Sequence, residues 1–323
     1  MKRIAVFTSG GDSPGMNACI RAVTRSGLAM GLEVFGIRSG YEGMIEGDIY
    51  PLEKNAVSNI IQLGGTILQT ARSKEFHTVE GRKKAYQNLR KHQIEGVVAI
   101  GGDGTFRGAH VFMQEYPDIA FVGTPGTIDN DLFGTDFTIG FDTAINTAMN
   151  AIDNIKDTAN AHNRLFFVEV MGRDAGFIAL NTAIATGAEA VLLPETTTDL
   201  GKLIEQLENN YRNKKRASIV VVSEGDEAGG AFKIADHVKE KCPQFDIKVA
   251  ILGHIQRGGR PSCSERVLAS RLGLEAVRAL VAGKKSVMVG EVNKEIVFTP
   301  FDHAAKKHQE INPVLIEMVD LLA

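Results

Sequence analysis

The stretch Arg3–Gly15, RIAVFTSGGDSPG, decides the fold class of this chain. It joins a run of apolar and β-branched residues to two adjacent glycines and then to a serine–proline pair. A continuous apolar run of this kind predicts a strand buried on both faces, as strands of parallel sheets are. Ser13 followed by Pro14 predicts a helix N-cap with proline in the first turn, and the helix runs on through Arg21 and Arg25.

The same arrangement recurs along the chain, because further apolar runs end in glycine and polar residues and are followed by helical patterns. These runs are Gly96–Ile100 before GGDGT, Ile119–Gly123 before TPGTIDND, Leu165–Val170 before MGRDAG, Ser218–Val222 before SEG, and Val249–Leu252 before GHIQRGG. The helical patterns cover 80–92, 104–116, 141–160, 174–187, 199–214 and 264–282. Repeated strand–helix units predict an α/β fold with mostly parallel sheets, arranged as Rossmann-like lobes of three αβα layers. Ligands of such sheets bind at the carboxyl ends of the strands, where this sequence places its glycines, aspartates and arginines.

The length of 323 residues corresponds to about two domains. The sequence contains no low-complexity linker, so we expect two lobes joined by several crossing segments. The expected larger lobe takes residues 1–140 plus 256–306, and the smaller lobe takes 141–255 plus 307–323.

The composition excludes several classes of protein. With 36 Lys and Arg against 39 Asp and Glu, the net charge of −3 lacks the basic excess typical of nucleic-acid binding. No apolar run approaches the ~20 residues of a membrane span, and the apolar run at the start is too short for a signal peptide. Three cysteines without a CxxC pair favour neither a disulfide framework nor a zinc site. We therefore expect a cytoplasmic protein that binds neither nucleic acid nor membrane.

The loop SGGDSPG at Ser9–Gly15 is a candidate phosphate cradle. Its glycines allow close backbone approach to a ligand, and the helix that follows offers free N–H groups. The motif is neither a Walker A loop nor a GxGxxG fingerprint. A tight turn between strand and helix explains the loop alone equally well.

The loop GGDGTFRG at Gly101–Gly108 is more specific, because it places a carboxylate between glycines at the start of a helix. Asp103 there can hold Mg²⁺, which typically takes one or two carboxylates together with substrate phosphates. The alternative is that Asp103 only caps the helix.

The loop TPGTIDND at Thr124–Asp131 carries two carboxylates directly after a strand. Phosphoryl transfer to an alcohol needs a carboxylate that accepts the proton of the attacking hydroxyl. Asp129 fits that base, and Asp131 fits an electrostatic or structural helper. Turn caps are the alternative interpretation of both residues.

Cationic side chains stand in the neighbouring loops. Arginine binds phosphate through a bidentate fork, so several arginines at strand ends indicate a phosphorylated substrate and a polyphosphate. Taken singly, each arginine is as well explained by a surface ion pair, and hydrogen bonding suits His254 better than metal binding. The residues are Arg72, Arg164, Arg173, His254 and Arg257, with Glu224 in the SEG loop.

These motifs together resemble those of the bacterial ATP-dependent 6-phosphofructokinase family. TSGGDSPGMNACIRA, IGGDGTFRGA, PGTIDNDLFGTDFTIGFDTA, VEVMGRDAG and LGHIQRGG match in order from residue 3 to about residue 290. The resemblance implies transfer of the γ-phosphoryl group of Mg²⁺-bound ATP to the 1-hydroxyl of fructose 6-phosphate. It also implies an ATP- and Mg²⁺-binding larger lobe, a fructose 6-phosphate-binding smaller lobe, and a homotetramer.

The resemblance also implies roles for individual residues. The catalytic residues are Asp129 as base, with Thr127, Arg72 and Arg173. The nucleotide site takes Gly11, Tyr41, Arg72, Ser73, Gly102, Asp103 as the Mg²⁺ ligand, Gly104, Thr105 and Gly108. The sugar-phosphate site takes Thr127, Asp129, Asp131, Met171, Gly172, Arg173, Glu224, His254 and Arg257, with Arg164 and Lys248 from a neighbouring subunit.

The resemblance is incomplete at some positions. Lys248 stands where a cross-subunit arginine is usual, so the charge is kept and the fork is lost. An effector site for ADP or phosphoenolpyruvate would use Arg21, Arg25, Lys54, Lys156, Gly187, Glu189, Lys215 and Arg216, of which Lys54 and Lys156 replace arginines.

The phosphoryl donor is expected to be ATP. Pyrophosphate-dependent relatives carry Asp in place of Gly104 and Lys in place of Gly126, and two glycines leave room for a nucleotide. The alternatives are a pyrophosphate-dependent enzyme, a NAD or lipid kinase that shares the GGDGT loop, and a non-catalytic nucleotide or sugar-phosphate sensor.

Overall fold

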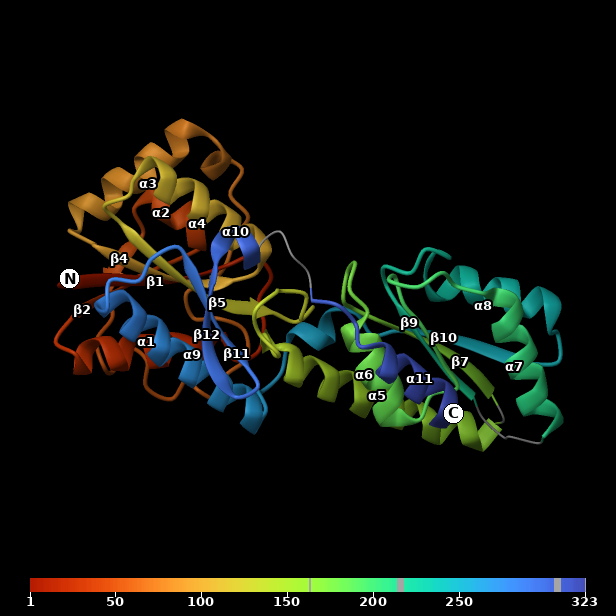
Figure 1. The fold of residues 1–323 in the computed structure, drawn as a ribbon. Coiled ribbons are helices and arrows are strands. Elements are labelled where there is room, and N and C mark those ends of the chain that lie inside the picture. The colour runs from red at the N-terminus through yellow and green to blue at the C-terminus, as the bar shows by residue number, and fades with distance from the viewer. Residues whose placement is uncertain (163, 214–217, 305–308, 323) are drawn as a thin grey trace. The chain divides into compact units, whose positions relative to one another are not determined.

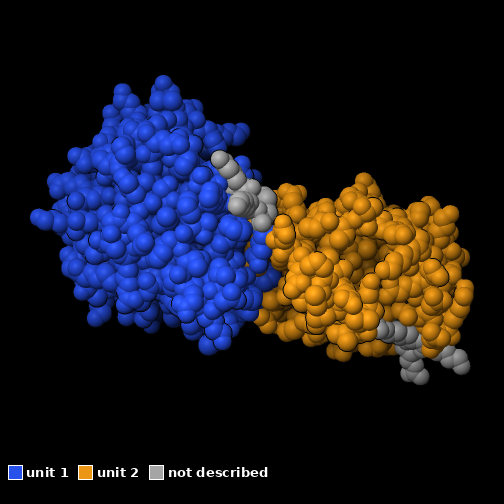
Figure 2. All heavy atoms as spheres, in the orientation of Figure 1, with its two compact units in different colours: residues 1–128, 132–143, 257–309 blue, residues 129–131, 144–256, 310–323 orange. Residues whose placement is uncertain are grey.

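The chain divides into two compact units, which Figure 2 colours separately. The computed structural model describes residues 1–162, 164–213, 218–304 and 309–322. Unit 1 comprises residues 1–128, 132–143 and 257–309, and unit 2 comprises residues 129–131, 144–256 and 310–323. Apart from the short segment 129–131, the chain passes from one unit to the other after residues 143, 256 and 309. From the sequence, these boundaries were expected after residues 140, 255 and 306.

Unit 1 is built on an eight-stranded sheet with the order β12-β11-β5-β4-β1-β2-β3, and β6 pairs with β5. The five pairings β1–β2, β1–β4, β4–β5, β5–β6 and β5–β11 are parallel, and β2–β3 and β11–β12 are antiparallel. The strands are β1 (Arg3–Ser9), β2 (Glu33–Ile37), β3 (Ile49–Pro51), β4 (Gly96–Gly101), β5 (Ala120–Thr127), β6 (Ile139–Gly140), β11 (Val287–Val292) and β12 (Glu295–Pro300).

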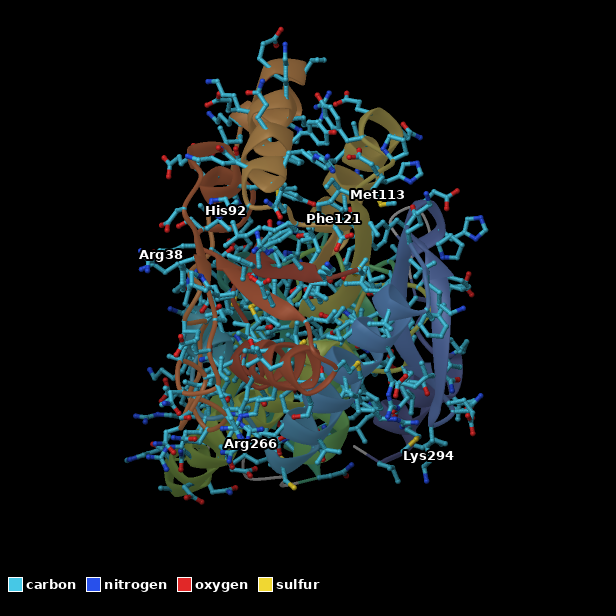
Figure 3. The ribbon with its side chains drawn as sticks, turned by 90° about the vertical axis from the view of Figure 1, so that its left-hand side faces the viewer. Arg38, His92, Met113, Phe121, Arg266 and Lys294 are labelled. Carbon is cyan, nitrogen blue, oxygen red and sulfur yellow. The ribbon has the colours of Figure 1, made fainter. Side chains whose placement is uncertain are left out.

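Helices cover both faces of this sheet, which confirms the expected three layers (Figure 1). Side chains alternate across a strand, so Phe7 of β1 joins one core and Val6 joins the other. Phe121 lies inside one of these cores, whereas Arg38 and Lys294 are exposed (Figure 3). The helices are α1 (Met16–Ala29), α2 (Gly40–Glu46), α3 (Val79–Lys91), α4 (Asp103–Glu115), α9 (Cys263–Val281) and α10 (Phe301–Ala304), with a 3-10 turn η1 (Glu75–His77).

Unit 2 is a smaller α/β layer structure on a four-stranded, fully parallel sheet of order β10-β7-β9-β8. Its core contains Phe167, Val220 and Val222, all completely buried. The strands are β7 (Arg164–Val170), β8 (Ala190–Leu192), β9 (Ser218–Ser223) and β10 (Asp246–Ile251). The helices are α5 (Phe141–His162), whose first three residues belong to unit 1, α6 (Phe177–Thr186), α7 (Leu200–Arg212), α8 (Gly230–Lys241) and α11 (Pro313–Leu322). A 3-10 turn η2 (Gly253–Arg257) follows β10, and its last residue, Arg257, belongs to unit 1.

The predicted cap of α1 is wrong. The N-cap is Gly15, with φ +96° and no side-chain cap hydrogen bond. The Ser13 hydroxyl instead donates to the carbonyl of Ile139 on β6 at 2.7 Å. A contact 126 residues away along the chain thus replaces the local cap that the serine–proline pair indicated. No helix among the described residues is long and apolar enough to span a membrane.

Candidate active site

Two of the glycine-rich loops of unit 1 meet through Arg257. The Arg257 guanidinium Nη1 donates to the carbonyl of Asp12 at 3.3 Å. A Cβ atom on Gly11 would lie 2.5 Å from the same Nη1, so a larger residue at position 11 would displace the guanidinium. The sequence predicted Gly11 and Arg257 as ligand-binding residues separately, and the structure brings them together.

Asp103 lies at the first position of α4, directly after Gly102, which is the N-cap and makes no side-chain cap hydrogen bond. The interpretation of Asp103 as the helix cap is therefore wrong. Its carboxylate instead faces Arg107 one turn on, whose Nε donates to Oδ1 at 2.7 Å and whose Nη2 pairs with Oδ2. Arg107 was not singled out in the sequence, although the i, i+4 spacing on a helix is the signal for such a pair.

Tyr41 supports the α4 loop from inside the protein. Its hydroxyl donates to the carbonyl of Thr105 at 2.5 Å, and its ring stacks on Phe76 with 3.9 Å between centroids. A Cβ atom on Gly108 would lie only 3.0 Å from that ring, so glycine permits the close packing. Burial raises the pKa of Tyr41, which keeps the hydroxyl a hydrogen-bond donor.

Arg72 and Ser73 precede η1. The Arg72 side chain is exposed, and the Ser73 hydroxyl accepts a hydrogen bond from the backbone N–H of Phe76 at 3.1 Å. An exposed guanidinium in this position is available to an anionic ligand.

The two glycines predicted to select the phosphoryl donor differ in their surroundings. A Cβ atom on Gly104 would meet no atom within 4 Å. A Cβ atom on Gly126 would lie 3.1 Å from the side chains of Ile100 and Met16. The surroundings of Gly104 are therefore open, whereas a side chain at position 126 would be in tight contact with Ile100 and Met16.

The first four residues of the TPGTIDND motif, Thr124–Thr127, form the end of β5, so the strand runs further than the sequence predicted. The Thr138 hydroxyl donates to the carbonyl of Thr127 at 2.6 Å and so fixes the end of the strand. Asp129 is buried, with 8% of its surface exposed, and Asn130 adopts a left-handed conformation with φ +55°. Asp131 is half-buried.

Three loops of unit 2 converge around the MGR motif. Arg173 has φ +54°, and its backbone N–H donates to Glu224 Oε1 at 2.8 Å. The backbone N–H of Met171 donates to Gln256 Oε1 at 3.3 Å. Gly172 precedes with φ +143°, a conformation that favours glycine. The MGR, SEG and GHIQ segments are therefore brought together, as the strand-end argument predicted.

Gln256 was missed in the sequence, although it links two of these segments. It is completely buried, and its Nε2 donates to the carbonyl of Gly253 at 3.0 Å. Its neighbour His254 is exposed. A buried glutamine that bonds two backbones orients the loop, and no short motif announces such a residue.

Arg164 and Lys248 share one carboxylate. Arg164 Nε donates to Asp246 Oδ2 at 2.8 Å, and Lys248 Nζ lies 2.7 Å from Asp246 Oδ1. The register of β7 against β10 places Asp246 opposite Arg164. The Lys248 ammonium and then the Arg164 guanidinium hold the pKa of Asp246 below its usual range. Sequence reasoning missed Asp246, because its role depends on which strands pair.

The residues predicted for an effector site lie in both units. In unit 2, Lys156 Nζ donates to the carbonyl of Thr186 and to that of Gly187, the latter at 3.3 Å, and Asn210 Nδ2 donates to the buried Glu189 Oε2 at 2.7 Å. In unit 1, Arg21 and Arg25 are half-buried on α1, and Lys54 is exposed. Lys215 and Arg216 lie outside the described residues.

No group of three or more His, Cys, Asp or Glu among the described residues is placed to hold a metal ion. Asp103, half-buried at a helix N-terminus, offers one hard oxygen ligand. This donor set fits Mg²⁺, which usually keeps several waters and takes one or two carboxylates with substrate phosphates.

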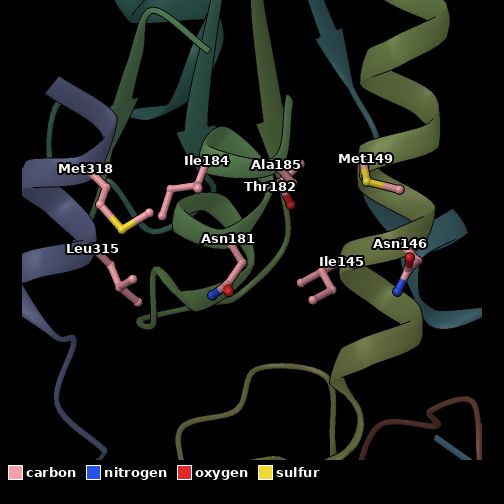
Figure 4. Close-up of a pocket in the computed structure, with 9 residues that line it drawn as sticks. All are labelled: Ile145, Asn146, Met149, Asn181, Thr182, Ile184, Ala185, Leu315 and Met318. Atoms are coloured by element: carbon pink, nitrogen blue, oxygen red, sulfur yellow. The ribbon is translucent and has the colours of Figure 1, made fainter. Parts of the chain in front are cut away.

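A cavity of about 350 Å³ lies within unit 2 between α5, α6 and α11 (Figure 4). Its lining is mostly apolar and includes Ile145, Ile184 and Leu315. None of the predicted site residues lines it, so the cavity is separate from the loops described above.

The fold and these loops define an α/β protein with glycine-rich loops, a carboxylate at the start of a helix and several arginines. The phosphofructokinase family model matches residues 3–280. This chain belongs to the phosphofructokinase family.

Named relatives cover the whole chain. It is 57% identical over 323 residues to ATP-dependent 6-phosphofructokinase 1 of Thermus thermophilus, with all of both chains covered. It is 53% identical over 323 residues to ATP-dependent 6-phosphofructokinase 2 of Bacteroides thetaiotaomicron, with 100% of this chain and 99% of the relative covered.

Solved structures share the fold. Phosphofructokinase from Saccharomyces cerevisiae matches with a TM-score of 0.90 at 36% identity, over 95% of this chain and 45% of the yeast chain. Pyrophosphate-dependent phosphofructokinase from Marinobacter aquaeolei matches with a TM-score of 0.85 over 97% of this chain and 86% of the other. Its identity of 23% indicates a shared fold alone.

Proposed function

We propose that this chain is an ATP-dependent 6-phosphofructokinase, which transfers the γ-phosphoryl group of ATP to the 1-hydroxyl of fructose 6-phosphate. The observation that carries the proposal is 57% identity over full length to a protein of that name. The products are fructose 1,6-bisphosphate and ADP.

In the proposed reaction, Asp129 accepts the proton of the 1-hydroxyl while that oxygen forms a bond to the γ-phosphorus. The bond between this phosphorus and the oxygen bridging to the β-phosphate breaks, and its electron pair stays with ADP. Thr127 lies beside the transferred group, and the Arg72 and Arg173 guanidinium groups stabilise the charge on its oxygens. Mg²⁺ bound through Asp103 would neutralise phosphate charge.

The remaining loop residues bind the two substrates. The backbone of Gly11, Gly102, Gly104, Thr105 and Gly108 lines the nucleotide site, supported by Tyr41, with Arg72 and Ser73 at its edge. Met171, Gly172, Glu224, His254 and Arg257 bind the sugar phosphate together with Asp131. The hydrogen bond from Arg173 to Glu224 and the contact of Arg257 with Asp12 support the grouping within each unit.

ATP is the proposed donor because of Gly104. The open space around its Cβ position leaves room beside the start of α4 for the α-phosphate of a nucleotide. An aspartate there would repel that phosphate. Turnover with pyrophosphate in place of ATP would contradict this choice of donor.

The assembly is proposed to be a homotetramer in the cytoplasm, with ADP or phosphoenolpyruvate as effectors. Arg164 and Lys248 are adjacent through Asp246, which supports their joint use toward the 6-phosphate in a neighbouring subunit. Light scattering after size exclusion gives the subunit number. Activity restored by mixing an Arg164→Ala variant with an Asp129→Asn variant tests the shared site.

A coupled ADP-release assay tests the reaction itself. The first reaction contains fructose 6-phosphate and ATP. The second contains pyrophosphate in place of ATP, and formation of fructose 1,6-bisphosphate is measured. The third contains ATP and NAD in place of the sugar phosphate. Turnover in the reaction with fructose 6-phosphate and ATP, and in neither of the other two, supports the proposal. Turnover with pyrophosphate alone, phosphorylation of NAD, or binding without product would support the three alternatives in turn.

A further inference from the structure

A buried carboxylate outside the proposed catalytic residues lies where α9, α5 and α1 of unit 1 begin. Glu265 in the first turn of α9 is completely buried. Its backbone N–H donates to the hydroxyl of the N-cap Ser262 at 3.1 Å. Its Oε2 accepts from both the backbone N–H and the hydroxyl of Thr143 in the first turn of α5, each at 3.2 Å.

The same side chain packs against the end of the Ser9–Gly15 loop. A Cβ atom on Gly15, the N-cap of α1, would lie 2.9 Å from Glu265 Cγ and 3.4 Å from Oε1. Among the described residues, Glu265 Oε1 has no hydrogen-bond partner. The segment 257–265 therefore contacts this loop twice, through Arg257 at Asp12 and through Glu265 at Gly15.

Burial of a carboxylate is costly for stability. A buried charge needs hydrogen bonds or opposite charge, and an oxygen without a partner adds to the cost. Three helix N-termini offset part of this cost, because each presents partial positive charge. Burial raises the pKa of Glu265 to about 7. Hydrogen bonds from the backbone of Gly140 and Thr143 lower the pKa and offset only part of this effect.

Other charged groups surround this junction. Asp142 of α5 pairs with the Ser262 hydroxyl, and its negative charge disfavours ionisation of Glu265. From the loop side the charged residue is Asp12. From the segment that leads into α9 the charged residues are Arg257 and Arg266, and the Arg266 Nε donates to the carbonyl of Pro261 at 2.9 Å. Arginine stays protonated at every pH used below.

We propose that Glu265 is a positioning residue, whose ionised carboxylate holds the Ser9–Gly15 loop against the starts of α5 and α9 in the geometry that binds nucleotide phosphates. The proposal rests on the proposed function, since it assigns that loop to ATP. It makes nucleotide affinity depend on one buried charge that touches no substrate.

Glu265→Gln provides the test, because a protonated glutamic acid and a glutamine have nearly the same shape. The dissociation constant of a non-hydrolysable ATP analogue with Mg²⁺ is measured by calorimetry between pH 6 and pH 8. At pH 6 we expect nearly equal constants for the variant and the wild type. At pH 8 the variant is expected to bind roughly three- to tenfold more weakly, the effect of about one ordinary hydrogen bond.

The ratio of the two constants removes the titration of the nucleotide itself, which is common to both proteins. Glu265→Asp keeps the charge and is expected to restore part of the pH dependence. Steady-state kinetics should show KM for ATP following the same ratio, while KM for fructose 6-phosphate changes by less than about twofold.

Glu115→Gln is the matched control. It removes a partly buried carboxylate of unit 1 that pairs with Arg82 at the far end of α4. The control should lower the melting temperature and leave the ratio of dissociation constants at one throughout.

A ratio for Glu265→Gln that is constant from pH 6 to pH 8, or tighter binding by the variant at pH 8, overturns the proposal. Failure of the wild type to bind the analogue would instead refute the ATP function itself, so the two failures are distinguishable.

Discussion

Arg107 and Asp103 lie one turn apart on α4, and the Arg107 guanidinium contacts both carboxylate oxygens of Asp103 in a bidentate ion pair. Asp103 is the residue proposed to bind Mg²⁺, and a metal ion and a guanidinium compete for the same oxygens. The arginine side chain is 64% exposed, so the pair is weak and can open when a nucleotide and its metal arrive.

The first prediction concerns Arg107→Met. An exposed i, i+4 ion pair contributes ~0.3–0.5 kcal/mol, which corresponds to about a twofold change in an equilibrium constant. The variant should therefore bind Mn²⁺, used as a probe for Mg²⁺, about twofold more tightly at saturating ATP analogue, as measured by electron paramagnetic resonance. Weaker Mn²⁺ binding would show that Arg107 assists the metal and does not compete with it.

Asp129→Asn removes the proposed base and keeps the size of the side chain. Turnover with ATP and fructose 6-phosphate should fall by ~10²–10⁴, the usual contribution of a positioned general base, while KM for both substrates changes much less. Stopped-time product assays and calorimetric substrate binding give the two quantities. Turnover within about twofold of the wild type would remove Asp129 from the mechanism.

Gly104→Asp tests the choice of phosphoryl donor. The space beside position 104 is open, so the folded state should accept the side chain with little loss of stability. Repulsion of the α-phosphate should raise KM for ATP by roughly tenfold or more, since one unfavourable charge contact costs on the order of 1.4 kcal/mol. Gly104→Ala is the control for size alone, and an equal KM in both variants would contradict the electrostatic explanation.

The fold was predictable because its signals are local. The continuous apolar runs, such as the one that contains Val6 and Phe7, and the glycines after each strand can be read in a single window of sequence. The role of Ser13 was misjudged because its partner Ile139 is remote in sequence. The packing around Gly126 was missed for the same reason, since Met16 and Ile100 surround it only after folding.

Within the candidate site, the proposed ligand-binding residues carry local sequence signals, whereas the residues that hold their loops in place do not. Asp103 and Arg173 lie in glycine loops at strand ends, where chemistry is expected. Asp246 and Gln256 act through strand register and loop packing, which single-sequence patterns do not specify. Arg107 was also missed, although in its case a local signal was available, since it stands four residues after Asp103 on a helix.

The ion pair between Arg82 of α3 and Glu115 of α4 gives a prediction about acid stability. Arg82 Nε and Nη2 donate to the two Glu115 oxygens at 2.8 and 2.6 Å. These hydrogen bonds from Arg82 lower the pKa of Glu115 from its ordinary value of 4.5. A carboxyl group with a lowered folded-state pKa stabilises the fold above its unfolded pKa, and this contribution disappears as the pH falls through the folded pKa.

Glu115→Gln should therefore lower the free energy of unfolding by about 1.5–3 kcal/mol near pH 7, the range for hydrogen bonds to a charged group. The difference between wild type and variant should stay constant down to about pH 5 and shrink below pH 4.5, because the wild-type carboxylate becomes protonated there. Urea denaturation followed by circular dichroism at several pH values measures it. A difference that grows as the pH falls would mean that Glu115 is stabilised in its protonated form, which the bidentate contact with an arginine does not allow.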